Sequence, residues 1–329
     1  MIDRLKDKCL LITGGAGFIG SNLCEHFLSN GVKVICLDNF STGKRKNIEN
    51  LIHHPYFTLI EGDIRDLDTC KKAAQKTDII LHQAALGSVP RSIENPITTN
   101  EVNITGFLNM LWAAKECKSE RFIFAASSST YGNHPALPKI EDKIGEPLSP
   151  YAVTKLVNEK YAAVFSKLYG IKTIGLRYFN VFGKNQDPDG QYAAAIPKFK
   201  KSFINNQPIT IFGNGEQTRD FTYIKNVIQA NELASVTENQ DAFNQIYNVA
   251  YGENTTLNEV INTLRNLLST YSKSVNEVKV IYEQERVGDI KHSLASIEKA
   301  KTLLNYSPKY NLNNGLVEAI DWYWKNLNS

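Results

Sequence analysis

The chain of 329 residues lacks the features that mark membrane, secreted or nucleic-acid-binding proteins. No apolar stretch approaches the ~20 residues that a membrane-spanning helix needs, and no charged-then-apolar leader opens the chain. The net charge is only +3 and the lysines are scattered, so no basic patch predicts binding to nucleic acid. We therefore expect a protein that binds neither membranes nor nucleic acids.

Cysteine and histidine are too few and too dispersed to predict disulfides or a metal site. The five cysteines are odd in number and widely spaced, mostly within apolar segments, which favours reduced core thiols in a cytoplasmic protein. Among the six histidines only His53 and His54 lie close together, and a surface loop accounts for that pair. We expect no metal. The length suits a substantial core and two domains.

A glycine-rich turn near the N-terminus predicts a dinucleotide-binding site. Residues 9–12 form a strand candidate, and a helical pattern runs to Leu28 beyond the turn. Between them, Gly14, Gly17 and Gly20 allow a tight turn, close approach of the backbone to a ligand and close helix packing. The free N–H groups at the helix start, reinforced by the helix dipole, suit a pyrophosphate.

An acidic residue at the end of the next strand candidate predicts which dinucleotide binds. Asp38 lies 18 residues after Gly20, where a carboxylate bonds a ribose 2′-hydroxyl. Because that carboxylate repels the 2′-phosphate of NADP, the sequence favours NAD. Arg45 lies nearby but suits a solvated loop. Asp63 either frames the adenine or caps a helix, and the sequence leaves both open.

The first half of the chain alternates between strand and helix patterns. Strand candidates lie at 9–12, 32–37, 57–60, 78–82, 121–126 and 171–176, and the helices between them include 100–117 and 151–169. This alternation predicts an α/β fold with a Rossmann-type, doubly wound parallel sheet. The pattern loosens after Asn180, with a helix near 193–205 and a strand at 209–212. Residues 227–238 and 245–249 are expected to return to the first domain.

Tyr151 and Lys155 form a candidate proton-transfer pair. Residues four apart on a helix lie on the same face, and a lysine ammonium favours the phenolate, so Lys155 is expected to lower the tyrosine pKa. This spacing is common in ordinary helices. It gains weight from Ser127, Ser128 and Ser129, which follow a buried strand candidate at the strand end where open α/β sheets bind ligands.

In its motifs the chain resembles the extended short-chain dehydrogenase/reductases, specifically the nucleotide-sugar epimerases. The matching segments span most of the chain: TGGAGFIG (13–20), DNFSTG (38–43), GDIRD (62–66), LHQAA (81–85), VNITG (102–106), SSSTYG (127–132), YAVTK (151–155), RYFNVFG (177–183), GEQTRDFTYI (215–224) and RVGDIKHS (286–293). Each is modest, but their order and spacing together are specific.

The resemblance implies an NAD-binding domain over residues 1–180 and about 225–250, and a smaller mixed α/β domain for a UDP-sugar over 181–224 and 251–329. It implies catalysis by Ser127, Tyr151 and Lys155, with the register of the three serines ambiguous. Besides Tyr151 and Lys155, the implied cofactor-binding residues are Gly14, Gly17, Phe18, Ile19, Asp38, Asn39, Ser41, Thr42, Gly43, Asp63, Ile64, Gln83, Ala84, Ala85, Asn103 and Phe179.

The resemblance also implies a set of substrate-binding residues. Asn180, Arg219 and Arg286 match positions that contact the diphosphate, where a guanidinium bonds phosphate oxygens in pairs. Asp289 matches a position that holds the uridine ribose. The remaining candidates are Ala194, Ala195, Phe212 and Thr222 in the nucleotide slot, with Gly87, Ser88, Arg91, Ser128, Ser129 and Ser293 around the sugar. Each of these roles has an alternative. Arg219 and Arg286 could form surface ion pairs, Asp289 could be a structural cap, and Ser293 could be an ordinary small packing residue.

Within the family the sequence favours 4-epimerisation. Related dehydratases carry an Asp-Glu pair after the catalytic hydroxyl residue and related decarboxylases a glutamate, whereas residues 128–130 here contain no carboxylate.

The identity of the sugar depends on other residues. A small Ser293 leaves room for a 2-acetamido group, which favours UDP-N-acetylglucosamine. Arg91 could instead pair with a 6-carboxylate, so the uronic acid forms of the sugar are an alternative. The sequence is also compatible with a UDP-glucose 4-epimerase, a net dehydrogenase or a non-catalytic NAD-binding regulator.

The resemblance finally implies a homodimer. Family members pair through helices equivalent to 100–117 and 151–169, which form a four-helix interface.

Overall fold

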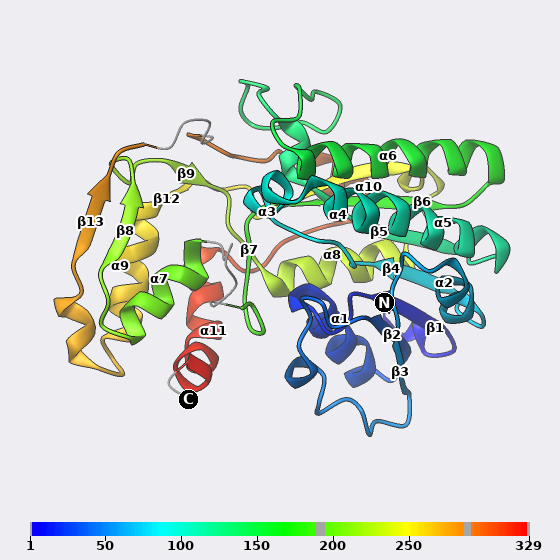
Figure 1. The fold of residues 1–329 in the computed structure, drawn as a ribbon, viewed down its shortest axis with the longest axis horizontal. Helices are drawn as coiled ribbons and strands as arrows, with labels where there is room; N and C mark the ends of the chain where they lie inside the picture. The colour runs from blue at the N-terminus through cyan, green and yellow to red at the C-terminus, as the bar shows by residue number, and fades with distance from the viewer. Residues whose placement is uncertain (1, 188–194, 286–290, 328–329) are drawn as a thin grey trace.

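A seven-stranded parallel sheet forms the centre of the molecule (Figure 1). The computed structural model describes residues 2–187, 195–285 and 291–327. The strand order is β11-β6-β5-β4-β1-β2-β3, which confirms the predicted doubly wound sheet. Its strands are β1 (Cys9–Thr13), β2 (Lys33–Asp38), β3 (Phe57–Glu61), β4 (Ile79–His82), β5 (Arg121–Ser127), β6 (Thr173–Tyr178) and β11 (Gln245–Val249).

Helices cover both faces of this sheet because its strands are apolar on both sides. In β1, Leu10 and Ile12 pack into one core cluster and Leu11 into the other. One face carries α1 (Phe18–Ser29) and α8 (Ile224–Val236); the other carries α2 (Leu67–Ala74), α5 (Gly106–Glu116) and α6 (Pro150–Tyr169). In the described part of the chain, no helix is both long and apolar enough to cross a bilayer.

The helix predicted at 100–117 is present, but it begins at Pro96 and contains a π-helical turn. The chain forms α3 (Val89–Glu94) and α4 (Pro96–Asn100), then a π-helical turn at Glu101–Thr105, and only then α5. π-helical turns inside helices often occur at functional sites. This turn contains Asn103, one of the predicted cofactor residues.

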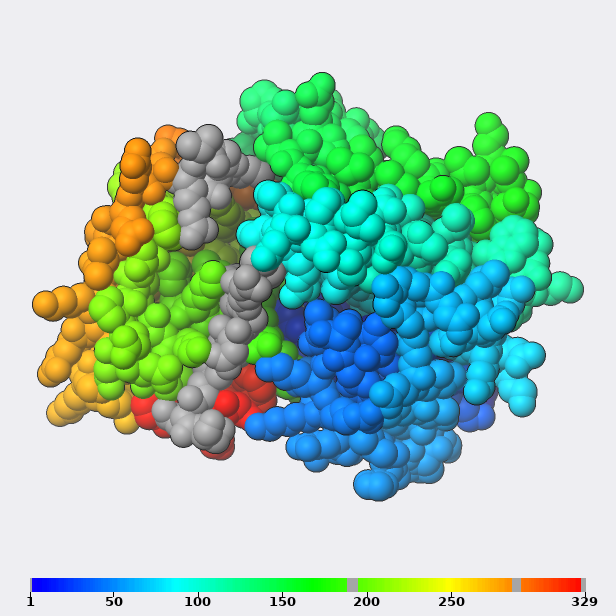
Figure 2. Space-filling view, in the orientation of Figure 1, coloured from blue at the N-terminus to red at the C-terminus, as the bar shows by residue number. Residues whose placement is uncertain are grey.

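The second part of the molecule is smaller and mixed (left in Figure 1; opposite the blue-to-cyan N-terminal part in Figure 2). Strands β8 (Ile209–Phe212) and β13 (Val280–Glu283) pair in parallel beside helices α7 (Ala195–Ile204), α9 (Leu257–Leu268) and α11 (Leu312–Leu327). Short pairs connect it to the sheet: β7 (Val181–Phe182) with β10 (Thr222–Tyr223), and β9 (Thr218–Arg219) with β12 (Thr255–Thr256). Helix α10 (Glu298–Leu304) packs against β11 and α8.

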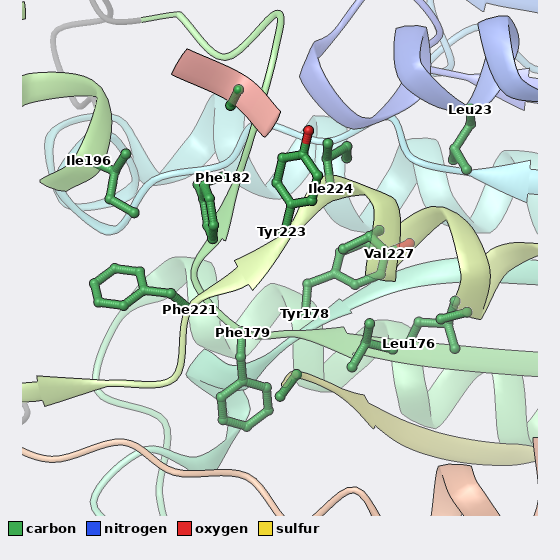
Figure 3. Close-up of a cluster of buried hydrophobic side chains, with 14 of the residues drawn as sticks. Leu23, Leu176, Tyr178, Phe179, Phe182, Ile196, Phe221, Tyr223, Ile224 and Val227 are labelled. Carbon is green, nitrogen blue, oxygen red and sulfur yellow. The ribbon is translucent and has the colours of Figure 1, made fainter. Parts of the chain in front are cut away.

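One hydrophobic core continues from the large sheet into this smaller part. Figure 3 shows Phe179, Phe182 and Tyr223 between Leu176, at the sheet, and Ile196, on α7, and all of them belong to the same buried cluster. The segments that leave the end of β6 are therefore held firmly, which matters because they carry Asn180 and lie beside the candidate site.

A buried ion pair fixes α6 to the sheet. Arg177 on β6 donates from Nε and Nη2 to the two carboxylate oxygens of Glu159 on α6, each at 2.8 Å. Its Nη1 donates to the Glu141 carbonyl at 2.9 Å. Both side chains of the pair are almost fully buried. The helix that carries Tyr151 and Lys155 is thereby anchored one turn beyond Lys155.

Candidate functional site

The glycine-rich turn has the geometry that a bound diphosphate requires. Gly14 adopts a positive φ of +66°, and a Cβ on Gly20 would lie 2.1 Å from the Gly14 carbonyl oxygen. Only glycine fits either position without moving the backbone. Helix α1 starts after Gly17, and no side chain caps its first turn. Its N-terminal N–H groups and dipole therefore remain available to an anion.

Asp38 lies at the end of β2, beside the turn. Its carboxylate accepts from the Ala16 N–H at 2.9 Å and from the Phe40 N–H at 2.8 Å. Burial raises the pKa of Asp38 above its usual range, and the two backbone donors oppose that shift. Each oxygen keeps a further lone pair, so the carboxylate can still accept from the hydroxyls of a ribose.

A first cavity of about 280 Å³ runs along this turn. It is lined by most of the predicted cofactor residues: Gly14, Gly17, Phe18, Ile19, Asp38, Asn39, Ser41, Thr42, Asp63, Ile64, Gln83, Ala84 and Ala85. Gly87, predicted at the sugar, lines this cavity instead. Gly20, the third glycine of the predicted turn, lines the cavity as well, whereas sequence reasoning missed Leu37, Gly62, Leu86 and Val102.

Five predicted cofactor residues do not line that cavity: Gly43, Asn103, Phe179, Tyr151 and Lys155. A Cβ on Gly43 would lie 2.9 Å from the Asp38 carboxylate oxygens, so Gly43 makes room for Asp38. Asn103 accepts from the Leu86 N–H at 2.8 Å and donates to its carbonyl at 3.1 Å, which fixes one wall of the cavity. Phe179 lines a second cavity, on the side of the smaller part.

Asp63 is not a helix cap. Asp66 caps α2 by accepting from the N–H groups of Asp68 and Thr69. Asp63 instead pairs with Arg65 at 2.7 Å and accepts from Asn39 at 2.9 Å. The hydrogen bond with Arg65 lowers the pKa of Asp63 to about 2, so the group stays ionised at the cavity edge.

Tyr151 and Lys155 lie in the first turns of α6. The Ser149 hydroxyl accepts from the Ala152 N–H at 3.2 Å and caps the helix, and Pro150 supplies its first residue. Lys155 is buried and donates from Nζ to the Ala125 carbonyl at 2.8 Å. Its Nζ lies 6.0 Å from the centre of the Tyr151 ring. The helix thus brings the two groups near each other, as the spacing predicts.

The expected effect of Lys155 on the tyrosine is not seen in the protein alone. Burial raises the pKa of Tyr151, and its hydrogen bond with Ser127 opposes this shift. Burial also lowers the pKa of Lys155 to about 8, against the attraction of Glu159. In the protein alone burial outweighs any effect of Lys155 on the pKa of Tyr151, and the lysine hydrogen-bonds the Ala125 carbonyl and not the phenol.

The three serines occupy different positions. Ser127 ends β5, contacts Tyr151, and accepts from the Ser129 N–H at 3.2 Å and the Ser129 hydroxyl at 2.9 Å. Ser128 and Ser129 line the second cavity. Of the three, Ser127 is the one bonded to the tyrosine.

The second cavity, of about 340 Å³, is bordered by Ser128 and Ser129 on one side and by segments of the smaller part on the other. The predicted substrate residues that line it are Ser128, Ser129, Asn180, Arg219 and Ser293. Sequence reasoning missed Val89, Pro90, Tyr131, Gly132, Lys139, Leu148, Ser149 and Ala152.

Other predicted substrate residues are not among those that line this cavity. Ser88 caps α3 by accepting from the Arg91 N–H, and Arg91 donates back to the Gly87 carbonyl at 3.5 Å. The Thr222 hydroxyl donates to the Val249 carbonyl at 3.5 Å, while Ala195 starts α7 and Phe212 ends β8. The predictions for Ala194, Arg286 and Asp289 lie outside the described residues.

The family model described as "NAD dependent epimerase/dehydratase family" matches residues 10–250 of the chain. The chain belongs to this family. The match covers the glycine turn, Asp38, the three serines, and Tyr151 with Lys155. NAD is the cofactor of the NAD-dependent epimerase/dehydratase family, and the uncapped helix start, the glycine cradle and Asp38 all suit it.

Three solved structures are similar to this family member over nearly its whole length. A UDP-N-acetylglucosamine 4-epimerase from Methanobrevibacter ruminantium M1, in complex with UDP-N-acetylmuramic acid, is 37% identical with a TM-score of 0.90, covering 97% of this chain and 99% of that one. A UDP-glucose 4-epimerase from Thermotoga maritima, with UDP-glucose, is 32% identical with a TM-score of 0.88 and the same coverage. A UDP-glucuronic acid 4-epimerase from Bacillus cereus, with UDP-glucuronic acid and NAD, is 35% identical with a TM-score of 0.87, covering 97% and 99%.

One buried acid in this epimerase/dehydratase family member was not foreseen. Asp220 is fully buried and accepts from the N–H groups of Tyr251, Gly252 and Ala295 at 3.1–3.2 Å. Burial raises the pKa of Asp220 to about 7, although the backbone donors oppose the shift. The carboxylate joins its own segment, which carries Arg219, to residues 251–252 and to Ala295, two positions after Ser293. Asp220 therefore holds in place the wall that both residues share.

Proposed function

We propose that the protein catalyses NAD-dependent 4-epimerisation of a UDP-hexose, with UDP-N-acetylglucosamine and UDP-N-acetylgalactosamine as the pair interconverted. The observation that carries the proposal is the hydrogen bond between Tyr151 and Ser127 beside the second cavity. The described lining of this cavity contains serine side chains and no carboxylate. Related dehydratases use a pair of carboxylates to eliminate water from the sugar, and the described lining residues offer no such pair. The three similar structures, each of a UDP-sugar 4-epimerase, support the same reaction.

In the proposed mechanism the protein supplies proton transfer and positioning. NAD held along the first cavity would supply the acceptor, and then the donor, for the C4 hydride. Tyr151 takes the proton of the C4 hydroxyl while Ser127 holds that oxygen. Lys155, charged below its pKa of about 8, stabilises the phenolate. Asn180 and Arg219 hold the diphosphate while the 4-keto sugar turns over, and Tyr151 then returns the proton.

The choice of sugar is supported by the small side chain at Ser293. This residue lines the second cavity together with Ser128 and Ser129, and its hydroxymethyl group leaves volume for a 2-acetamido substituent. UDP-glucose and UDP-N-acetylglucosaminuronic acid are the alternative substrates. Both would undergo the same chemistry at C4.

Incubation with UDP-N-acetylglucosamine and no added NAD tests the proposal. We expect UDP-N-acetylgalactosamine to accumulate to an equilibrium mixture without net formation of NADH, because the hydride is returned in each cycle. Nuclear magnetic resonance of the sugar and absorbance at the NADH band follow the two quantities. Stoichiometric NADH would indicate a net dehydrogenase. Absence of turnover with all three candidate sugars, in protein that binds NAD, would instead favour a non-catalytic regulator.

We also propose that α5 and α6 form a homodimer interface with a second copy. Along α6, Val153, Val164 and Leu168 are 46%, 50% and 66% exposed, and their spacing places them on one side of the helix. Tyr169 at the end of the helix is exposed as well. A row of exposed apolar side chains on a long helix is typical of a surface that another helix covers.

Leu168→Glu is expected to convert such a dimer to a monomer, because it would bury an unpaired carboxylate at the interface. Sedimentation velocity measures the change in mass. Val317→Glu on α11 is the matched control, since Val317 is also an exposed helical residue, at 51%. A wild-type protein that sediments as a monomer would contradict the interface, as would a Leu168→Glu variant that remains dimeric.

A further inference from the structure

Three polar side chains form a hydrogen-bonded cluster between α8 and the first cavity, here called the amide cluster: Gln83, Tyr178 and Asn231. The Tyr178 hydroxyl donates to Gln83 Oε1 at 3.0 Å, a shorter contact than its 3.4 Å to Asn231 Oδ1. Asn231 Nδ2 donates to that hydroxyl at 3.0 Å, and Gln83 Nε2 donates to Asn231 Oδ1 at 3.3 Å. Asn231 is fully buried and Tyr178 is buried. Because a buried polar group is costly without a partner, each member depends on the other two.

The amide cluster fixes the orientation of the Gln83 carboxamide. Asn231 Nδ2 also donates to the Val227 carbonyl on α8 at 2.8 Å, so Asn231 Oδ1 is the atom left to accept from Gln83. Burial raises the pKa of Tyr178 to about 12, so its hydroxyl keeps the proton that it donates to Gln83. These two bonds use one N–H and one lone pair of the carboxamide. A second N–H and a second lone pair remain for another molecule.

This carboxamide lies at the catalytic end of the first cavity. Gln83 directly follows β4 and lines that cavity. Tyr178 is the register partner of Ser127 in the pairing of β5 with β6, and Ser127 hydrogen-bonds Tyr151. The group that takes the sugar proton must lie beside the ring that takes the hydride, because both leave the same alcohol. The nicotinamide end of NAD is therefore expected here, with the adenosine end at Asp38.

We propose that Gln83 binds the carboxamide of the nicotinamide ring, and that Tyr178 and Asn231 are positioning residues that set the orientation of Gln83. The ring carboxamide offers an N–H donor and a carbonyl acceptor, which match the free lone pair and the free N–H of Gln83. A ring held in this way presents the same face to the sugar in both half-reactions. The inference rests on the proposed function only in placing the reacting ring beside Tyr151.

Exchange of the cofactor in the absence of any sugar tests this inference. Acetylpyridine adenine dinucleotide keeps the carbonyl of NAD but has a methyl group in place of the amide nitrogen, so it cannot donate to Gln83 Oε1. The purified protein is brought to equilibrium with equal, excess concentrations of both dinucleotides. Free cofactor is then removed, the protein is denatured, and mass spectrometry measures the ratio of the two bound dinucleotides. In the wild-type protein we expect this ratio to favour NAD by roughly twofold to tenfold, the value of one hydrogen bond between neutral groups.

Two variants separate contact from positioning. Gln83→Leu removes the carboxamide and should abolish the part of the preference that the hydrogen bond supplies. Tyr178→Phe should lower the ratio too, because the carboxamide can then turn. Tyr247→Phe is the matched control, since it also deletes a buried hydroxyl, one that donates to the Ala242 carbonyl at 2.8 Å and lines neither cavity. It should keep the wild-type ratio, because a general loss of stability affects both dinucleotides equally.

Each result decides one part of the inference. A ratio that Gln83→Leu leaves unchanged overturns the contact with the cofactor, and this comparison holds even if Tyr178→Phe does not fold. A ratio that falls in Gln83→Leu but not in Tyr178→Phe overturns the positioning role. No sugar is present in these measurements, so they do not depend on which sugar reacts. Failure of every UDP-sugar to react would contradict the proposed function and would leave the ratio as it is.

Discussion

Tyr151→Phe is expected to lower kcat by about 10²- to 10⁴-fold, the usual contribution of a positioned proton-transfer group. The change removes one oxygen atom from a residue that contacts Ser127 and lies near Lys155. Without that oxygen no side chain at this point of α6 can take the C4 proton as the hydride leaves. Steady-state kinetics with the preferred UDP-sugar measures the loss.

The variant should retain NAD and bind the UDP-sugar nearly as well as the wild-type protein. Tyr151 is not among the residues that line the first cavity, so bound NAD measured after denaturation should be unchanged. Tyr56→Phe, at an exposed tyrosine far along the chain, is the control and should keep full activity. Full turnover by Tyr151→Phe would remove the proposed mechanism.

The sequence predicted the sheet well because its signals are local. Runs such as 9–12 and 121–126 are apolar, short and bounded by turn residues, and such runs form buried parallel strands whatever lies far along the chain. The glycine spacing and Asp38 belong to one βαβ unit, so the first cavity was also predictable. The π-helical turn at 101–105 was not, since no proline or glycine lies within it.

The second cavity was harder to predict because distant segments build it. Lys139 reaches the cavity through backbone hydrogen bonds to residues 294–296, and Asp220 holds together segments that follow it by about 30 and 75 positions. No periodicity or motif in the sequence predicts these contacts.

The pKa of Tyr151 also depends on distant parts of the chain. Burial by the folded chain raises it and outweighs the lowering expected from the helical spacing of Lys155.

Glu159→Leu is expected to lower the free energy of unfolding by about 3–5 kcal/mol, the usual cost of removing one partner of a buried ion pair. The carboxylate of Glu159 accepts two hydrogen bonds from Arg177, which is only 3% exposed. Leucine would leave that guanidinium buried without an anion, held only by the Glu141 carbonyl and by its contact with Tyr131. Denaturant unfolding followed by circular dichroism measures the loss.

The double variant Arg177→Met/Glu159→Leu separates the charge from the packing. It should recover much of the stability, because an apolar pair of similar volume avoids the cost of a buried, unpaired charge. It should not restore the wild-type pH dependence of kcat. Glu159 raises the pKa of Lys155 against the effect of burial, so without Glu159 that pKa falls below about 8 and the lysine loses its proton at lower pH. The fall of kcat at alkaline pH should therefore begin at lower pH in both variants than in the wild-type protein. If it begins at the same pH, the charge of Lys155 does not stabilise the phenolate of Tyr151.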